Sequence, residues 1–118
     1  MMSRTHVLRV QGAYYMLTGF WPLAHMASFE AVTGPKTDDW LVRMVGLLAA
    51  VIGATLLTAG RQWQGAFEIL VLAVGSAMAF TAVDVWYVLQ GQISRIYLAD
   101  AAAEIGLVVL LLSGRRAA

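Results

Sequence analysis

The chain contains no cysteine, and charged residues are few. The absence of cysteine excludes disulfide bonds, thiol redox chemistry and metal sites built on thiolates. Only 13% of the 118 residues are charged, against about 25% in ordinary soluble domains. The net charge is +1 and the basic residues are scattered, so no basic stripe predicts a nucleic-acid partner. Of the two histidines, only His25 lies within an apolar segment. We therefore expect no haem or metal, and no cofactor is predicted.

Hydrophobic residues make up 60% of the chain, and the mean hydropathy is +0.73. This composition predicts an integral membrane protein. Four apolar segments, at about 7–32, 40–59, 66–89 and 96–113, are each close to the roughly 20 residues that cross about 30 Å of hydrocarbon. The connections between them are short, which makes neighbouring helices antiparallel. The predicted fold is an all-α integral membrane four-helix up-down-up-down bundle, forming one transmembrane domain over 1–118.

Two prolines and several glycines predict where these helices bend or end. Pro22 lies inside the first segment and predicts a kink, because it leaves one helical carbonyl without a donor. Gly34 and Pro35 end that segment, and Gly60 and Gly91 are the predicted ends of the next two.

The basic residues predict an orientation. Four spans put both termini on one side, with five arginines there and three basic residues on the other side. The positive-inside rule therefore predicts a bacterial inner-membrane protein with both termini in the cytoplasm. The two sets are Arg4, Arg9, Arg61, Arg115 and Arg116, against Lys36, Arg43 and Arg95.

Two carboxylates interrupt the last apolar segment. If this segment enters the membrane near residue 96, a rise of 1.5 Å per residue puts Asp100 about 6 Å and Glu104 about 12 Å into the membrane. An exposed charge near the bilayer centre costs at least about 2.5–3.5 kcal/mol. We therefore expect Glu104 to be buried against protein, and either paired or protonated. The opposite face of this helix is an apolar, lipid-facing stripe of Leu98, Ala102, Ile105, Val109 and Leu112.

The other three segments each send an ionisable group toward the same outer half. His25 shares a polar stripe with Trp21, and Asp84 lies in line with small residues of the third segment. Arg43 shares a small-residue face with Gly46, which would let helices approach closely, so Arg43 is predicted to point inward as a counter-charge. The same face could form a homodimer. The candidate ligand-binding residues are Trp21, His25, Arg43, Asp84, Asp100 and Glu104.

This cluster has two interpretations. One is an ion-pair network that only fixes helix register. The other is a polar cavity that binds a small polar or amphipathic ligand, or a partner subunit. Carboxylates outnumber bases, so a cationic or protonatable ligand is favoured over an anion. A proton-coupled carrier, in which Glu104 exchanges a proton for substrate, is the alternative function. An enzyme is less favoured, because the chain has no nucleophile, metal-ligand or phosphate-loop motif.

The densest set of unusual residues is the stretch FWPLAHMASFEAVTGPKTDDWLVRMVG, at 20–46. With four spans and an outward polar end, the chain resembles in architecture the small bacterial four-helix membrane proteins of the DoxX type. More distantly, it resembles the EXPERA-type sterol-binding bundles. No motif is shared, so the resemblance implies no functional residue. Small multidrug transporters have a similar length and span number. Their hallmark is a glutamate within the first helix, whereas here Glu30 lies only at its end.

Overall fold

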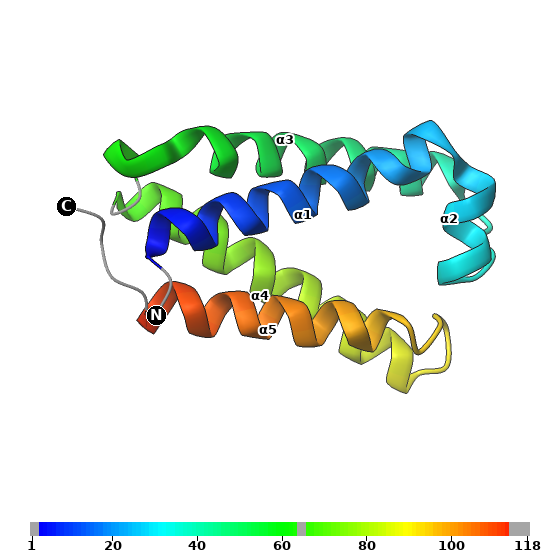
Figure 1. Ribbon diagram of the computed structural model, residues 1–118. Helices are drawn as coiled ribbons and strands as arrows, with labels where there is room; N and C mark the ends of the chain where they lie inside the picture. The colour runs from blue at the N-terminus through cyan, green and yellow to red at the C-terminus, as the bar shows by residue number, and fades with distance from the viewer. Residues whose placement is uncertain (1–2, 64–65, 114–118) are drawn as a thin grey trace.

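Five α-helices make up the described part of the chain, residues 3–63 and 66–113, in a computed structural model (Figure 1). The prediction of an all-α protein is confirmed for these residues. The helices are α1 (Arg4–Ala24), α2 (Met26–Thr33), α3 (Asp39–Trp63), α4 (Phe67–Leu89) and α5 (Tyr97–Ser113). The helix α4 ends as expected, because Gly91 follows it with a positive φ of 74°. The predicted end of the second span at Gly60 is wrong, because α3 continues through this glycine to Trp63. A glycine weakens a helix but does not by itself end it.

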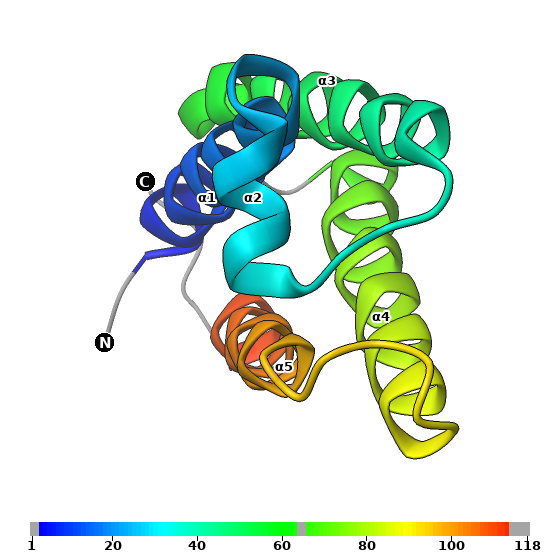
Figure 2. The ribbon, with the colours of Figure 1, turned by 90° about the vertical axis from the view of Figure 1, so that its right-hand side faces the viewer.

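The long helices form two antiparallel pairs. The helix α1 packs along α3, and α4 packs along α5 (Figure 1). Figure 2 shows that α4 crosses α3 at a steep angle and runs away from it, so the pairs separate toward the end that carries α2. At the opposite end, Arg4 Nε donates to the carbonyl oxygen of Leu111 at 3.2 Å and ties α1 to α5.

Glycines bring α1 and α3 into backbone contact. Gly12 lies opposite Gly53, and Gly19 lies opposite Gly46. A Cβ added to Gly12 would lie 2.6 Å from the Gly53 carbonyl oxygen, and one added to Gly19 would lie 2.5 Å from the Gly46 carbonyl oxygen. The predicted small-residue face of α3 is confirmed around Gly46, and α1 covers it within the chain. Its partner glycines on α1 were not predicted.

The first predicted span, 7–32, is wrong as a single helix, because the chain breaks at His25. Pro22 cannot donate a backbone hydrogen bond, and His25 has an extended backbone with φ −154° and ψ 83°. The His25 Nδ1 atom then accepts a hydrogen bond from the Ser28 backbone N–H at 3.1 Å, which caps α2. The eight-residue α2 therefore turns away from α1 and runs toward α5 (Figure 2).

Two helices in the described part of the chain are long and apolar enough to cross a membrane. They are α3 over Asp39–Ala59 and α4 over Phe67–Leu89. The helix α5 has 17 residues, and α1 carries two arginines and a glutamine. The arginines used to predict the orientation include Arg115 and Arg116, which lie outside the described residues.

Candidate functional site

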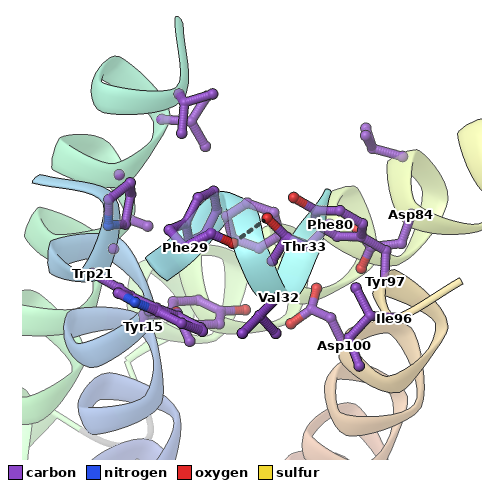
Figure 3. Close-up of a pocket in the computed structure, with 18 of the residues that line it drawn as sticks. Tyr15, Trp21, Phe29, Val32, Thr33, Phe80, Asp84, Ile96, Tyr97 and Asp100 are labelled. Carbon is purple, nitrogen blue, oxygen red and sulfur yellow. Dashed lines mark hydrogen bonds between the residues drawn. The ribbon is translucent and has the colours of Figure 1, made fainter. Parts of the chain in front are cut away.

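A cavity of about 740 Å³ lies between the two helix pairs, at the end of the molecule that carries α2. All five helices contribute to its wall, which is mostly aliphatic and aromatic. Figure 3 shows Asp84 and Asp100 on one side of this space and Trp21 and Phe29 on the other. The volume is within the range of about 300–1,000 Å³ that is usual for small-molecule sites.

Three carboxyl groups, those of Asp84, Asp100 and Glu104, belong to the cavity wall. Glu104 is 1% exposed, and Asp84 is 5% exposed. The prediction that Glu104 is buried against protein is confirmed. The predicted apolar stripe on the opposite face of α5 is exposed along its whole length, from Leu98 to Leu112, which confirms the helical-wheel assignment.

Two adjacent tyrosines of α1 hold the carboxyl groups of α5. The Tyr14 hydroxyl donates to Asp100 Oδ1, and the Tyr15 hydroxyl donates to Glu104 Oε1 at 2.6 Å. Gln11 Nε2 in turn donates to the Tyr15 hydroxyl at 3.1 Å and to the Ala73 carbonyl oxygen of α4 at 2.8 Å. Tyr15 was not predicted as a site residue. Its spacing of four residues from Gln11, which places both on one helical face, is the signal that could have found it.

Lys36 is the only basic residue among the described residues that line the cavity. Its ammonium group contacts the end of α2 and not the three carboxyl groups. Its Nζ donates to the carbonyl oxygens of Thr33 and Gly34, at 3.1 and 2.7 Å, and to the Thr33 hydroxyl. The same Nζ lies 5.7 Å from the ring centre of Phe29 and 5.2 Å from that of Tyr97. Lys36 therefore fastens the end of α2 to α5.

No basic group of the cavity wall, as far as the structure describes it, is left to neutralise the carboxyl groups. Asp84 Oδ2 is buried and has no hydrogen-bond partner. Nor do three acidic or histidine side chains of the described residues converge closely enough to hold a metal ion. The negative charge of any ionised carboxyl group among Asp84, Asp100 and Glu104 is therefore not paired with a basic side chain of the described wall.

Arg43, predicted as the counter-charge, is exposed on the outside of α3, and that prediction is wrong. The face of α3 that contacts α1 follows the line of Gly46 and Gly53. At about 100° per residue, Val42 lies nearer to this line than Arg43 does. Val42 is accordingly the half-buried residue that lines the cavity, whereas Arg43 points away from it.

The two remaining candidates are Trp21, which precedes the break, and His25, which lies at it. Trp21 lines the cavity, and its Nε1 donates to Ser28 Oγ at 2.9 Å. Its ring stands edge-on to Phe29, with ring centres 5.4 Å apart. His25 is exposed and does not belong to the cavity wall. Its side chain caps α2 and so positions the aromatic residues that do line the cavity.

A second acidic pair lies at the rim, where α2 approaches the start of α3. Hydrogen bonding with the Asp39 side chain, followed by burial and the negative charge of Asp39, raises the pKa of the Glu30 carboxyl above its ordinary value. A raised pKa means that the folded protein holds this proton more tightly than the unfolded chain does. The contact between Glu30 and Asp39 therefore stabilises the fold at low pH, and this contribution is lost as the pH rises through the pKa of Glu30.

Comparisons with protein-family models, with curated proteins and with solved structures find no match to this chain. The architectural resemblance to DoxX-type proteins therefore stays a prediction. Function is inferred from the cavity and its carboxyl groups.

The Tyr15→Phe substitution is expected to destabilise the protein by about 1–3 kcal/mol, because Glu104 loses a buried donor and Gln11 loses a buried acceptor. Thermal unfolding in detergent, followed by circular dichroism, measures the effect. Tyr87→Phe is the matched control, since Tyr87 is exposed on α4. Equal unfolding temperatures for the two variants would contradict the role assigned to Tyr15.

Proposed function

We propose that this chain is a four-span membrane protein that binds a small cationic amphipathic molecule in the cavity between its helix pairs. The single observation that carries the proposal is an apolar cavity whose three carboxyl groups have no basic partner on its described wall. An ammonium group can neutralise these carboxyl groups, while the apolar part of the same molecule contacts the aliphatic and aromatic wall. Trp21 and Phe29 add ring faces, which attract cations.

The exposed surface supports a membrane location for all four long helices. Each of them exposes large apolar side chains, such as Leu17 on α1, Val51 on α3, Leu89 on α4 and Leu112 on α5. Water-soluble proteins rarely expose apolar surface of this extent, whereas lipid chains accept it. With the termini in the cytoplasm, as the positive-inside rule predicts, the cavity belongs to the outer half of the membrane.

Binding is favoured over proton-coupled transport, the alternative function. A carrier must give its substrate access from both faces of the membrane. On the terminal side of Glu104, Tyr15 and Gln11 form a polar layer. Toward the terminal end lies a buried apolar cluster that includes Val7, Leu8, Leu56, Leu107 and Leu111, with Thr5 as a further buried polar residue at that end. This cluster separates the cavity from that end of the bundle.

Titration with tetraphenylphosphonium, a lipophilic cation small enough for the cavity, tests the proposal. We expect saturable binding to the protein in lipid nanodiscs, measured by calorimetry. The neutral triphenylphosphine oxide, which has three of the same rings and no net charge, is expected to bind at least about tenfold more weakly, since the carboxylates do not attract it as a cation. Equal affinities for the cation and the neutral compound, or no binding of the cation, would contradict the proposed function.

A further inference from the structure

The cavity reaches the surface of the bundle between α3 and α4, and this opening identifies the class of ligand. We propose that the ligand is a long-chain amine dissolved in the bilayer, which passes sideways between α3 and α4. Its ammonium group lies against the carboxyl groups of the cavity, and its alkyl chain extends through the opening into lipid. This inference rests on the proposed function and adds the route and the shape of the ligand.

The opening is defined by residues that line the cavity and are also exposed on the outside. On α3 these are Leu41, 41% exposed, and Val45, 51% exposed. On α4 the corresponding residue is Val83, 52% exposed. A side chain that lines a cavity and is also half exposed marks the place where the cavity meets the surface. Figure 2 shows that α3 and α4 diverge on this side of the molecule.

The two helices that flank the opening are the two described helices long and apolar enough to cross a membrane. The opening therefore faces lipid chains rather than water. Its side chains, Leu41, Val45 and Val83, are all aliphatic and match the hydrocarbon of a lipid or of an alkyl chain. A ligand that does not partition into the bilayer would not reach this opening.

The end of the cavity that carries α2 is partly covered by this helix. The helix α2 lies across this end and contributes Phe29 and Thr33 to the wall. Lys36 fastens α2 to Tyr97 of α5 through its hydrogen bonds at the end of α2 and its position over the two aromatic rings. Val32 and Ile96 also line the cavity at this end and are 51% and 44% exposed, so the cavity reaches the surface here too. The opening between α3 and α4 differs because it is flanked by the two described helices that are long and apolar enough to cross a membrane.

Polarity changes along the path from the opening to the inner wall. The opening is aliphatic, whereas Asp100 and Glu104 lie on α5 and Asp84 faces the same space from α4. An amine with a single alkyl chain matches this order, with its charged end inward and its chain outward. Complementary charge at the carboxyl groups selects an ammonium over a carboxylate or phosphate head group.

Substituting tryptophan at the opening tests the route. In nanodiscs, Val45→Trp and Val83→Trp are expected to weaken the binding of dodecylamine by about tenfold, because a large side chain then fills the space of the alkyl chain. The control is Leu48→Trp, at an exposed position of α3 that does not line the cavity. It should leave the dodecylamine affinity unchanged.

The outcomes separate this inference from the proposed function. Unchanged dodecylamine binding in both tryptophan variants, with tetraphenylphosphonium still bound by the unmodified protein, would overturn the sideways route and leave the proposed function standing. Failure of both dodecylamine and tetraphenylphosphonium to bind the unmodified protein would overturn both the sideways route and the proposed function.

A second measurement of the route needs no substitution. A dodecylamine with a photoreactive diazirine at the end of its chain is expected to label Leu41, Val45 or Val83. Labelling confined to the lipid-facing stripe of α5 would contradict the route.

Discussion

The Gly12→Ala substitution is expected to lower the unfolding temperature of the protein in detergent by about 5 °C or more. A Cβ at this position would lie 2.6 Å from the Gly53 carbonyl oxygen and 2.8 Å from the Leu57 backbone nitrogen. Both are backbone atoms of α3, so no side chain can rotate away to make room, and α1 must move from α3. Overpacking of this kind costs about 1–3 kcal/mol. Because α1 carries Tyr14 and Tyr15, ligand binding is expected to weaken together with stability.

Gly106→Ala is the control for this prediction. Gly106 lies within α5, and a Cβ added there would meet no atom within 4 Å. Alanine has a higher helix propensity than glycine, by about 0.8–1.0 kcal/mol, so the unfolding temperature should stay the same or rise slightly. Gly53→Ala, which fills the Gly12 contact from the other side, should resemble Gly12→Ala. If Gly12→Ala and Gly106→Ala unfold at the same temperature, the close approach of α1 and α3 is refuted.

The periodic faces of the helices could be predicted from the sequence because they depend only on helical spacing. The exposed stripe of α5 and the buried line of Ala73, Ala77, Thr81 and Asp84 on α4 both follow from residues three or four positions apart. The burial of Glu104 follows from the cost of exposing a charge to lipid. The convergence of Asp84, Asp100 and Glu104 on one space could be predicted in the same way.

The break at His25 could not be predicted from spacing, and one error follows from it. A helical wheel assumes that the helix continues, whereas Pro22 and the side-chain cap of His25 end α1 and start α2. The wheel therefore predicts His25 in the cavity, although it lies outside. The error at Arg43 has another cause, because Val42 rather than Arg43 lies nearest to the line of Gly46 and Gly53 that contacts α1. The role of Lys36 was also missed, because its contacts join a loop to α2 and α5 and have no sequence period.

Replacing all three carboxyl groups of the cavity with amides, as Asp84→Asn, Asp100→Asn and Glu104→Gln together, is expected to abolish binding while preserving stability. The amide oxygens can still accept the hydrogen bonds of Tyr14 and Tyr15, so these contacts to α1 are kept. The three acids no longer repel one another or need a counter-charge. The unfolding temperature of the empty protein should therefore stay the same or rise.

Ligand binding, unlike stability, should be lost in this triple variant. A phosphonium charge about 5–6 Å from a carboxylate is attracted by about 3 kcal/mol at an effective dielectric constant of about 20. The loss of the carboxylates should therefore weaken tetraphenylphosphonium binding by at least about a hundredfold. The control is Glu68→Gln, which neutralises an exposed acid of α4 outside the cavity and should change neither property. A triple variant that unfolds at a markedly lower temperature would show that the acids stabilise the bundle and would support the purely structural interpretation. If the three carboxyl groups bind the ligand, the triple variant should be more stable and should no longer bind it. The reason is that these groups destabilise the empty protein, and the ligand compensates their charge.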